Sequence, residues 1–290
     1  MTIKRYPIEI ELTNYCGLEC VYCVNKDLTN KWYLEEGDYD LFLDYVLNNI
    51  NNILYVNIAG IGDIFLHPNI NNFLIKFIKT FKNTNIDVLL STKGLTIGKS
   101  INLLKQFKEN QINLNISIGL FSFNPDKHDE FTQRKGSFKN TLNSVLILKK
   151  EKLNFSLELL VSKYSISSLN QFMLFWKKLG TNTILHKPHN FWWRISLKDE
   201  DINEFWLKDF CDFSWKQDKK WKYYRDLTNC NFIPFVDIEW NFNLCSLSAH
   251  SWKELLYNLN NVWNFFDNYI DLVENFKELI EKQCINCSLK

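Results

Sequence analysis

The sequence predicts an α/β fold: a partial (β/α)6 TIM-like barrel followed by a small C-terminal α+β domain. Over the first two-thirds of the 290 residues, short β-branched runs alternate with longer segments of helical periodicity, which is typical of parallel strands joined by crossover helices. After about Pro188 the alternation stops, and eight of the ten tryptophans lie between Trp192 and Trp263. We therefore expect a barrel at residues 1–188 and a second domain at residues 189–290.

Six β-branched runs predict the barrel strands: Ile8–Leu12, Leu54–Ala59, Ile86–Ser91, Leu114–Gly119, Phe155–Val161 and Thr183–Lys187. The segments between them predict helices at Tyr39–Asn49, Asn69–Lys82, Ile101–Glu109, Phe138–Lys149 and Ser168–Leu179. The second of these helices has the spacing of an amphipathic helix, with one face formed by Ile70, Phe73, Leu74, Phe77 and Ile78. Chemistry in a barrel gathers at the carboxyl ends of the strands, so the residues that follow each strand are the candidates for a site.

The C-terminal third predicts fewer elements. Strand-like pieces occur at Phe235–Trp240 and in a short run that ends at Cys245. A long amphipathic segment, Trp252–Lys282, predicts a helix and leads to a close pair of cysteines, Cys284 and Cys287.

Composition and charge exclude some classes of function. The chain is 46% hydrophobic and has a formal net charge of +1, so we expect neither a nucleic acid nor an anionic membrane as partner. Glu9 and Glu11 interrupt the apolar run near the N-terminus, which argues against a signal peptide. We expect a cytoplasmic protein, in which the eight cysteines serve as metal ligands or reactive thiols rather than in disulfides.

Three cysteines, Cys16, Cys20 and Cys23, follow the first predicted strand directly. Three thiolates can bind three irons of a 4Fe–4S cube and leave the fourth iron open, whereas ordinary electron-transfer clusters use four cysteines. A zinc ion is the alternative, although zinc sites usually show paired Cys-x-x-Cys units and a fourth ligand would come from elsewhere. The spacing favours a cluster and leaves zinc open.

This cysteine motif resembles the signature of the radical S-adenosylmethionine (SAM) superfamily, with Tyr22 at the aromatic position before the last cysteine. The resemblance extends over roughly residues 6–187. It implies that Cys16, Cys20 and Cys23 bind a catalytic 4Fe–4S cluster and that a flavodoxin or ferredoxin type of protein donates one electron. That chemistry converts SAM to methionine and a 5′-deoxyadenosyl radical, which removes a hydrogen atom from a substrate C–H bond.

The segment after the second predicted strand, residues 60–68, resembles the glycine-rich motif of this superfamily. The resemblance implies that Gly60, Gly62 and Asp63 lie at the amino group of SAM. Asp63 stands where the family has glutamate, and Ile64 stands where it has proline. The negative charge is kept, but the side chain of Asp63 is shorter.

Three further positions match the family and imply contacts with SAM. Lys93 follows the third predicted strand, within a Thr-Lys-Gly run where the family often has Thr-Asn-Gly. Ser117 lies near the end of the fourth, where the family often has Ser-x-Asp and this chain has Gly119. Arg134 precedes a Gly-Ser-Phe run, and its guanidinium suits the SAM carboxylate in charge and shape.

A second set of cysteines lies in the C-terminal third: Cys230, Cys245, Cys284 and Cys287. Their layout resembles the Twitch domain of SPASM/Twitch radical SAM enzymes and implies a second, auxiliary 4Fe–4S cluster with four protein ligands. The run Val236–Cys245 resembles the hairpin of that domain, with asparagine in place of the turn glycine. A four-thiolate zinc site and unliganded buried thiols remain the alternatives.

The resemblance implies a radical SAM enzyme of oxidoreductase type, with two substrate classes in competition. The first is a peptide or protein, which enzymes of this domain type often modify. The second is a small molecule, such as the sugar-like alcohol of an aminoglycoside-pathway dehydrogenase. A non-catalytic metal-binding scaffold is the alternative of another class, favoured by the departures at Asp63, Ile64 and Gly119.

Overall fold

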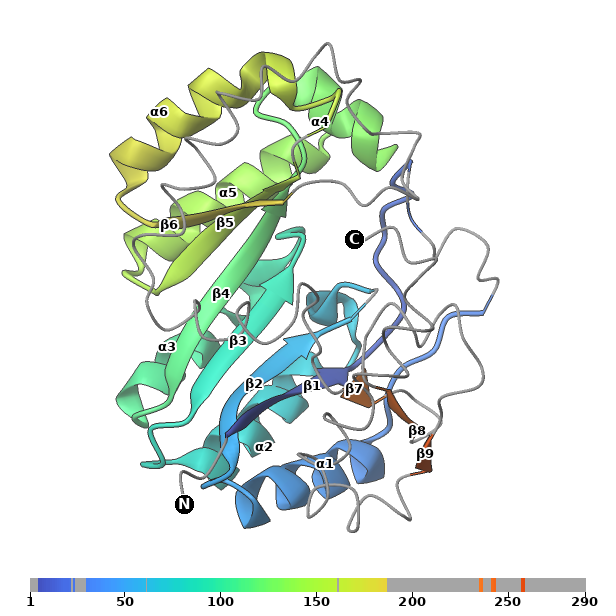
Figure 1. The fold of residues 1–290 in the computed structure, drawn as a ribbon, viewed down its shortest axis with the longest axis vertical. Helices are drawn as coiled ribbons and strands as arrows, with labels where there is room; N and C mark the ends of the chain where they lie inside the picture. Colours follow the sequence, from blue (N-terminus) through green and yellow to red (C-terminus); the bar gives the residue numbers. More distant parts are fainter. Residues whose placement is uncertain are drawn as a thin grey trace, which may run out of the picture.

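The computed structural model describes residues 5–21, 23, 30–60, 62–160 and 162–186, together with the short strands at 235–236, 241–243 and 257–258. Within these residues, parallel strands and helices alternate along the chain (Figure 1). The parallel strands are β1 (Tyr6–Glu11), β2 (Ile53–Ala59), β3 (Asp87–Thr92), β4 (Asn113–Leu120), β5 (Phe155–Leu160) and β6 (Asn182–His186). They lie side by side in sequence order, and each pairs in parallel with the next.

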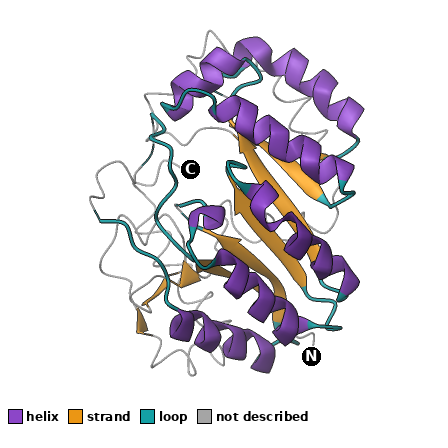
Figure 2. Cartoon of the chain, turned by 180° about the vertical axis from the view of Figure 1, so that it is seen from behind, coloured by secondary structure: helices purple, strands orange, loops and turns teal. Residues whose placement is uncertain are grey.

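The helices cover one face of this sheet (Figure 2). The α-helices are α1 (Glu36–Asn48), α2 (Ile70–Phe81), α3 (Ile101–Glu109), α4 (Pro125–Thr132), α5 (Ser137–Lys150) and α6 (Leu169–Leu179). Short 3-10 helices occur at η2 (Ile64–Leu66), η3 (Ile97–Ser100) and η4 (Ile166–Ser168). All six predicted barrel strands and all five predicted helices of this part are confirmed, with bounds that agree or differ by at most three residues.

The hydrophobic core lies between the sheet and the helices. Alternate strand residues such as Ile10, Ile58 and Leu90 point into it, as period-2 alternation requires. The apolar face of α2 meets them, and its predicted members are all buried. Phe77 of this face stacks on Phe107 of α3, with ring centroids 5.8 Å apart. Burial of these rings anchors the helical layer to the sheet.

Three short strands extend the sheet beyond β1. β7 (Phe235–Val236) pairs in parallel with β1, and β8 (Asn241–Asn243) pairs antiparallel with β7. This antiparallel pairing agrees with the hairpin predicted over Val236–Cys245, of which residues 237–240 and 244–245 lie outside the described residues. β9 (Tyr257–Asn258) pairs antiparallel with β8, so these two residues are extended where the sequence predicted a helix over Trp252–Lys282. Pairing with the edge of β8 outweighs their local helical pattern.

Candidate active site

The loops that follow β1, β2, β3 and β4 meet at one edge of the sheet, because parallel strands all end there. Figure 1 shows this edge beside the chain that leaves β1. The structure brings six predicted site residues to this edge: Cys16, Cys20, Cys23, Asp63, Lys93 and Arg134. Within the described residues, no helix is both long and apolar enough to cross a membrane.

Two of the three thiols in the cysteine loop are enclosed. Cys16 is 7% exposed and Cys20 is 5% exposed, while Cys23 is half-buried. The Cys20 side chain packs in an apolar cluster with Phe121, Phe131 and Leu160. These three residues come from α4 and from the ends of β4 and β5, and they screen the thiol from water.

Burial raises the pKa of Cys16 to about 11 and that of Cys20 to about 12. The positive charge of Lys93 acts on both thiols in the opposite direction. Without a metal both thiols are therefore protonated at neutral pH, and a bound iron would take the place of the proton. The three thiols lie on one loop, and two of them are buried near the positive charge of Lys93. This arrangement fits an iron–sulfur cluster.

Ligands of one zinc ion would have to converge, since each Zn–S bond is only about 2.3 Å long. In the part of the chain that the structure describes, no three His, Cys, Asp or Glu side chains are grouped around a single position in this way.

The glycine-rich loop after β2 lies against the backbone that leads to Cys16. A Cβ atom on Gly62 would lie 2.1 Å from the carbonyl oxygen of Thr13 and 2.9 Å from the carbonyl carbon of Asn14. The backbone N–H of Asp63 donates to the carbonyl of Tyr15 at 2.9 Å. Glycine at position 62 is therefore needed for the contact between two loops of the protein itself.

Asp63 is fully buried and braces the ends of β2 and β3. Its Oδ1 accepts hydrogen bonds from the Phe65 N–H at 3.1 Å and from the Thr92 hydroxyl at 2.8 Å. Its Oδ2 accepts from the Lys93 N–H at 3.0 Å. Burial raises the pKa of Asp63, although these three donors favour the charged form. The buried carboxylate thus fixes the loops after β2 and β3 relative to each other.

Replacing Asp63 with asparagine is expected to destabilise the fold by about 1–3 kcal/mol, because an amide N–H would face one of the three buried donors. Urea unfolding of the variant measures this loss. Asp44→Asn is the matched control, since Asp44 is exposed on α1 and its change should stay within about 0.5 kcal/mol. Equal stability of the two variants would contradict the bracing role.

The junction between α4 and α5 also makes hydrogen bonds to the cysteine loop. The N–H groups of Glu19 and Val21 donate to the carbonyls of Thr132 at 3.1 Å and Phe131 at 3.0 Å. Arg134 Nη1 donates to the carbonyl of Gly17 at 2.6 Å. The loop that carries the thiols is therefore fixed at three backbone positions by one segment.

Asp129 organises this junction. Its carboxylate accepts from the N–H groups of Gly136 and Phe138 and from the Ser137 hydroxyl. Partial burial acts to raise the pKa of Asp129, but these donors lower it on balance. Burial lowers the pKa of His128 to about 4, so its neutral ring shares a hydrogen bond with Ser137 at 3.1 Å. This network sets the turn that presents Arg134.

Lys93 extends across the sheet edge. A Cβ atom on Gly119 would lie 3.8 Å from the Lys93 Nζ, which also lies 5.8 Å from the centre of the Phe121 ring. Two of the departures from the family pattern, Lys93 and Gly119, are thus neighbours in space. A larger side chain at position 119 would compete with the lysine for this place.

Ser117 lies within the strand β4, whereas the other described contacts lie in loops that follow strands or helices. It is buried in β4, and its hydroxyl donates to the Glu158 carboxylate on β5. The sequence did not single out Glu158 or the apolar cover of Cys20, because these residues meet Ser117 and the cysteine loop only after the sheet has formed. Tyr22 and the four C-terminal cysteines, Cys230, Cys245, Cys284 and Cys287, lie outside the described residues.

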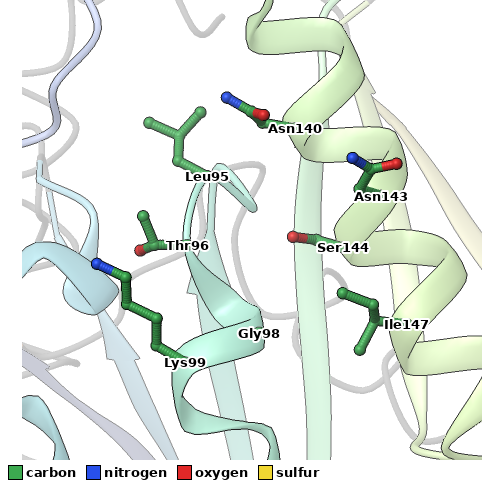
Figure 3. Close-up of a pocket in the computed structure, with 8 residues that line it drawn as sticks. All are labelled: Leu95, Thr96, Gly98, Lys99, Asn140, Asn143, Ser144 and Ile147. Atoms are coloured by element: carbon green, nitrogen blue, oxygen red, sulfur yellow. The ribbon is translucent and has the colours of Figure 1, made fainter.

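A separate pocket lies on the outer layer, between the η3 segment and α5 (Figure 3). It has a volume of about 300 Å³ and is lined by Leu95, Thr96, Gly98, Lys99, Asn140, Asn143, Ser144 and Ile147. None of the predicted site residues lines it. Its walls offer amides, hydroxyls and one lysine but no thiol or carboxylate.

Comparison with known proteins identifies relatives of this fold and site. The Radical SAM superfamily profile matches residues 10–175. Over 144 residues the chain is 34% identical to the antilisterial bacteriocin subtilosin biosynthesis protein AlbA of Bacillus subtilis (strain 168). The matched region covers 48% of this chain and 29% of AlbA. It is 25% identical over 223 residues to a cysteine-type anaerobic sulfatase-maturating enzyme of Clostridium novyi (strain NT), covering 68% of this chain and 58% of that enzyme.

The fold also matches solved structures of Streptococcus suis SuiB. Bound to S-adenosylmethionine, SuiB superposes with a TM-score of 0.65 and 13% identity, over 88% of this chain and 63% of SuiB. Bound to its precursor peptide SuiA, it gives a TM-score of 0.65 and 14% identity, over 88% of this chain and 62% of SuiB. At such identities the likeness concerns the fold, and the chain spans about 60% or less of the curated relatives it matches.

Proposed function

Because the chain belongs to the radical SAM superfamily, whose members use a 4Fe–4S cluster and SAM, we propose that it is an enzyme that activates a C–H bond of a peptide or protein. When bound, the cluster and SAM supply a 5′-deoxyadenosyl radical for this step. The observation that carries the proposal is the cysteine loop, with Cys16 and Cys20 enclosed at the carboxyl edge of the sheet.

Cys16, Cys20 and Cys23 would hold the cluster. The surrounding residues would hold the cysteine loop in place and exclude water from the site. Phe121, Phe131 and Leu160 exclude water from the side of Cys20. The backbone contacts of the α4–α5 junction hold the loop in one position. A preorganised, dry site of this kind protects a reactive species from side reactions.

The SAM contacts belong to the same proposal. Gly60, Gly62, Lys93 and Ser117 line or support the edge at which SAM would lie, and Tyr22 would flank the cluster. Asp63 would act by positioning the loops after β2 and β3, since its carboxylate bonds inside the fold. Arg134 would bind the SAM carboxylate while it holds the carbonyl of Gly17.

Replacing Arg134 with glutamine is expected to weaken SAM binding about 10-fold or more, because a charge-assisted hydrogen bond contributes about 1.5–3 kcal/mol. Equilibrium dialysis with labelled SAM on cluster-loaded protein measures this change. The matched control is Lys135→Gln, which removes the same charge from the adjacent exposed residue and should leave the affinity unchanged. Similar losses in both variants would indicate a general effect of charge and would contradict the proposed contact.

The names of the relatives support a peptide or protein substrate. AlbA is named for biosynthesis of a bacteriocin, the Clostridium enzyme for maturation of a sulfatase, and SuiB was solved with a precursor peptide. We propose an oxidoreductase-type reaction in the cytoplasm, with a flavodoxin or ferredoxin type of electron donor. The test is mass spectrometry of peptides encoded beside the gene after anaerobic incubation. A SAM-dependent mass change supports the proposal, and oxidation of a sugar-like alcohol instead would favour the small-molecule alternative.

We also propose that residues 189–290 form the second domain and that Cys230, Cys245, Cys284 and Cys287 bind an auxiliary 4Fe–4S cluster. The β7–β8 hairpin supports this, because it ends two residues before Cys245. Zinc and bare thiols remain the alternatives, and the iron content of the purified protein distinguishes them.

A further inference from the structure

The face of the sheet opposite the helices is polar at β1 and β2. The interior of a packed barrel is usually filled by branched apolar side chains. Here the interior positions hold Glu9, Glu11 and Asn57, which are 6%, 2% and 6% exposed. Their neighbours in sequence, such as Ile10 and Ile58, point to the helical side and join the core. Polar groups buried in this way need hydrogen-bond partners, which the protein or a ligand can supply.

Asn57 has a defined orientation in this wall. It lies opposite Glu9 in the parallel register, and its Nδ2 donates a hydrogen bond to the Glu9 Oε2. The flipped amide would place two acceptors against each other, so the orientation is fixed. The Asn57 Oδ1 is then buried and has no hydrogen-bond partner among the described residues. A buried acceptor without a partner destabilises the protein, and a donor on a ligand would offset this cost.

Glu11 lies one step closer to the cysteine loop. It packs against Gly60, whose φ of +127° is one that other residues rarely adopt. A Cβ atom on Gly60 would lie 2.3 Å from the Glu11 Cγ and 2.4 Å from its Oε1. Because Gly60 has no side chain, it leaves room for the side chain of Glu11. Glu11 is the last residue of β1 and directly precedes the loop that carries Cys16.

We propose that the Asn57 Oδ1 and the carboxylates of Glu9 and Glu11 form a subsite for a protonated primary amine of the substrate, such as a lysine side chain in a peptide. All three groups present acceptors, and an ammonium group is a compact cation with three donors and no acceptor. The subsite rests on the proposed function, because it would hold the substrate on the inner face beneath the cysteine loop.

The experiment measures binding to the full-length, cluster-loaded chain under anaerobic conditions by calorimetry. The probes are the peptide acetyl-Gly-Gly-Lys-Gly-Gly-amide, the same peptide with norleucine in place of lysine, and 1,4-diaminobutane. The lysine peptide should bind about 10-fold or more tightly than the norleucine peptide, the equivalent of one charged hydrogen bond. Tighter binding of 1,4-diaminobutane than of the lysine peptide would support the subsite and assign the amine to a small molecule.

Two isosteric variants, Glu9→Gln and Glu11→Gln, should each remove most of this preference. Glu109→Gln is the matched control, because it removes the same charge from the exposed end of α3. Equal binding of the lysine and norleucine peptides, or an unchanged preference in both inner-face variants, would overturn the subsite. SAM cleavage by the same samples is scored separately. Cleavage without amine selectivity rejects the subsite alone, and amine selectivity without cleavage rejects the proposed function alone.

Discussion

Replacing Cys20 with alanine is expected to reduce SAM cleavage to the background of iron-free protein. The cluster would lose one of three ligands, and Cys16 and Cys23 are the other cysteines among the described residues. The measurement combines the visible and electron paramagnetic resonance spectra of the reconstituted protein with 5′-deoxyadenosine formation. The visible and paramagnetic signals of the cluster at Cys16, Cys20 and Cys23 should disappear together with the product. An incomplete thiolate set leaves an iron of the cube without its protein ligand.

Cys211→Ala is the matched control for this variant. Cys211 belongs to neither cysteine set, so its loss should leave the spectra and the product unchanged. Circular dichroism and unfolding curves establish whether Cys20→Ala keeps the fold. A folded Cys20→Ala protein that still forms 5′-deoxyadenosine would remove Cys20 from the proposed ligand set.

The second large effect is expected at Gly62. Alanine there would place a Cβ atom 2.1 Å from the Thr13 oxygen and 2.8 Å from the Thr13 carbonyl carbon. Both are backbone atoms, so no side chain can rotate away and the loops after β1 and β2 must separate. We expect a loss of about 3 kcal/mol or more in the free energy of unfolding, together with poor cluster incorporation, because this contact sets the path of the chain to Cys16.

Gly37→Ala provides the comparison for Gly62→Ala. Gly37 lies in α1, and a Cβ atom there would have nothing within 4 Å. The change should stabilise the protein by up to about 1 kcal/mol, since alanine is the better helix former. Chemical denaturation of both variants gives the two values. A Gly62→Ala protein as stable as the parent would show that the two loops do not touch as described.

Much of the barrel could be predicted from the sequence because its signals are local. A short β-branched and apolar run marks β3, and a 3.6-residue period marks α2, so both elements appear close to their expected bounds. The cysteine loop was placed correctly after β1 for the same reason. Helix α4 was not predicted, although Asn124 caps it and Pro125 opens it, because only a few of its residues face the core.

The interior of the site could not be predicted in the same way. Glu9 and Glu11 were interpreted as breaks in an apolar run, but the pairing of β1 with β2 buries both. Asp63 was predicted to contact SAM, and its carboxylate turns out to be bonded to Thr92 and to the Lys93 backbone, some thirty residues away. Such partners depend on strand register, which sets neighbours that no single segment of sequence contains.

The most direct measurement is made on anaerobically purified, iron-reconstituted protein: iron and sulfide per chain, followed by 5′-deoxyadenosine formed from SAM and dithionite. We expect roughly eight irons per chain, four for each 4Fe–4S cluster, together with formation of 5′-deoxyadenosine. About four irons with product would keep the enzyme and remove the auxiliary cluster. Bound zinc without iron and without product would contradict the assignment of Cys16, Cys20 and Cys23 and leave a metal-binding scaffold.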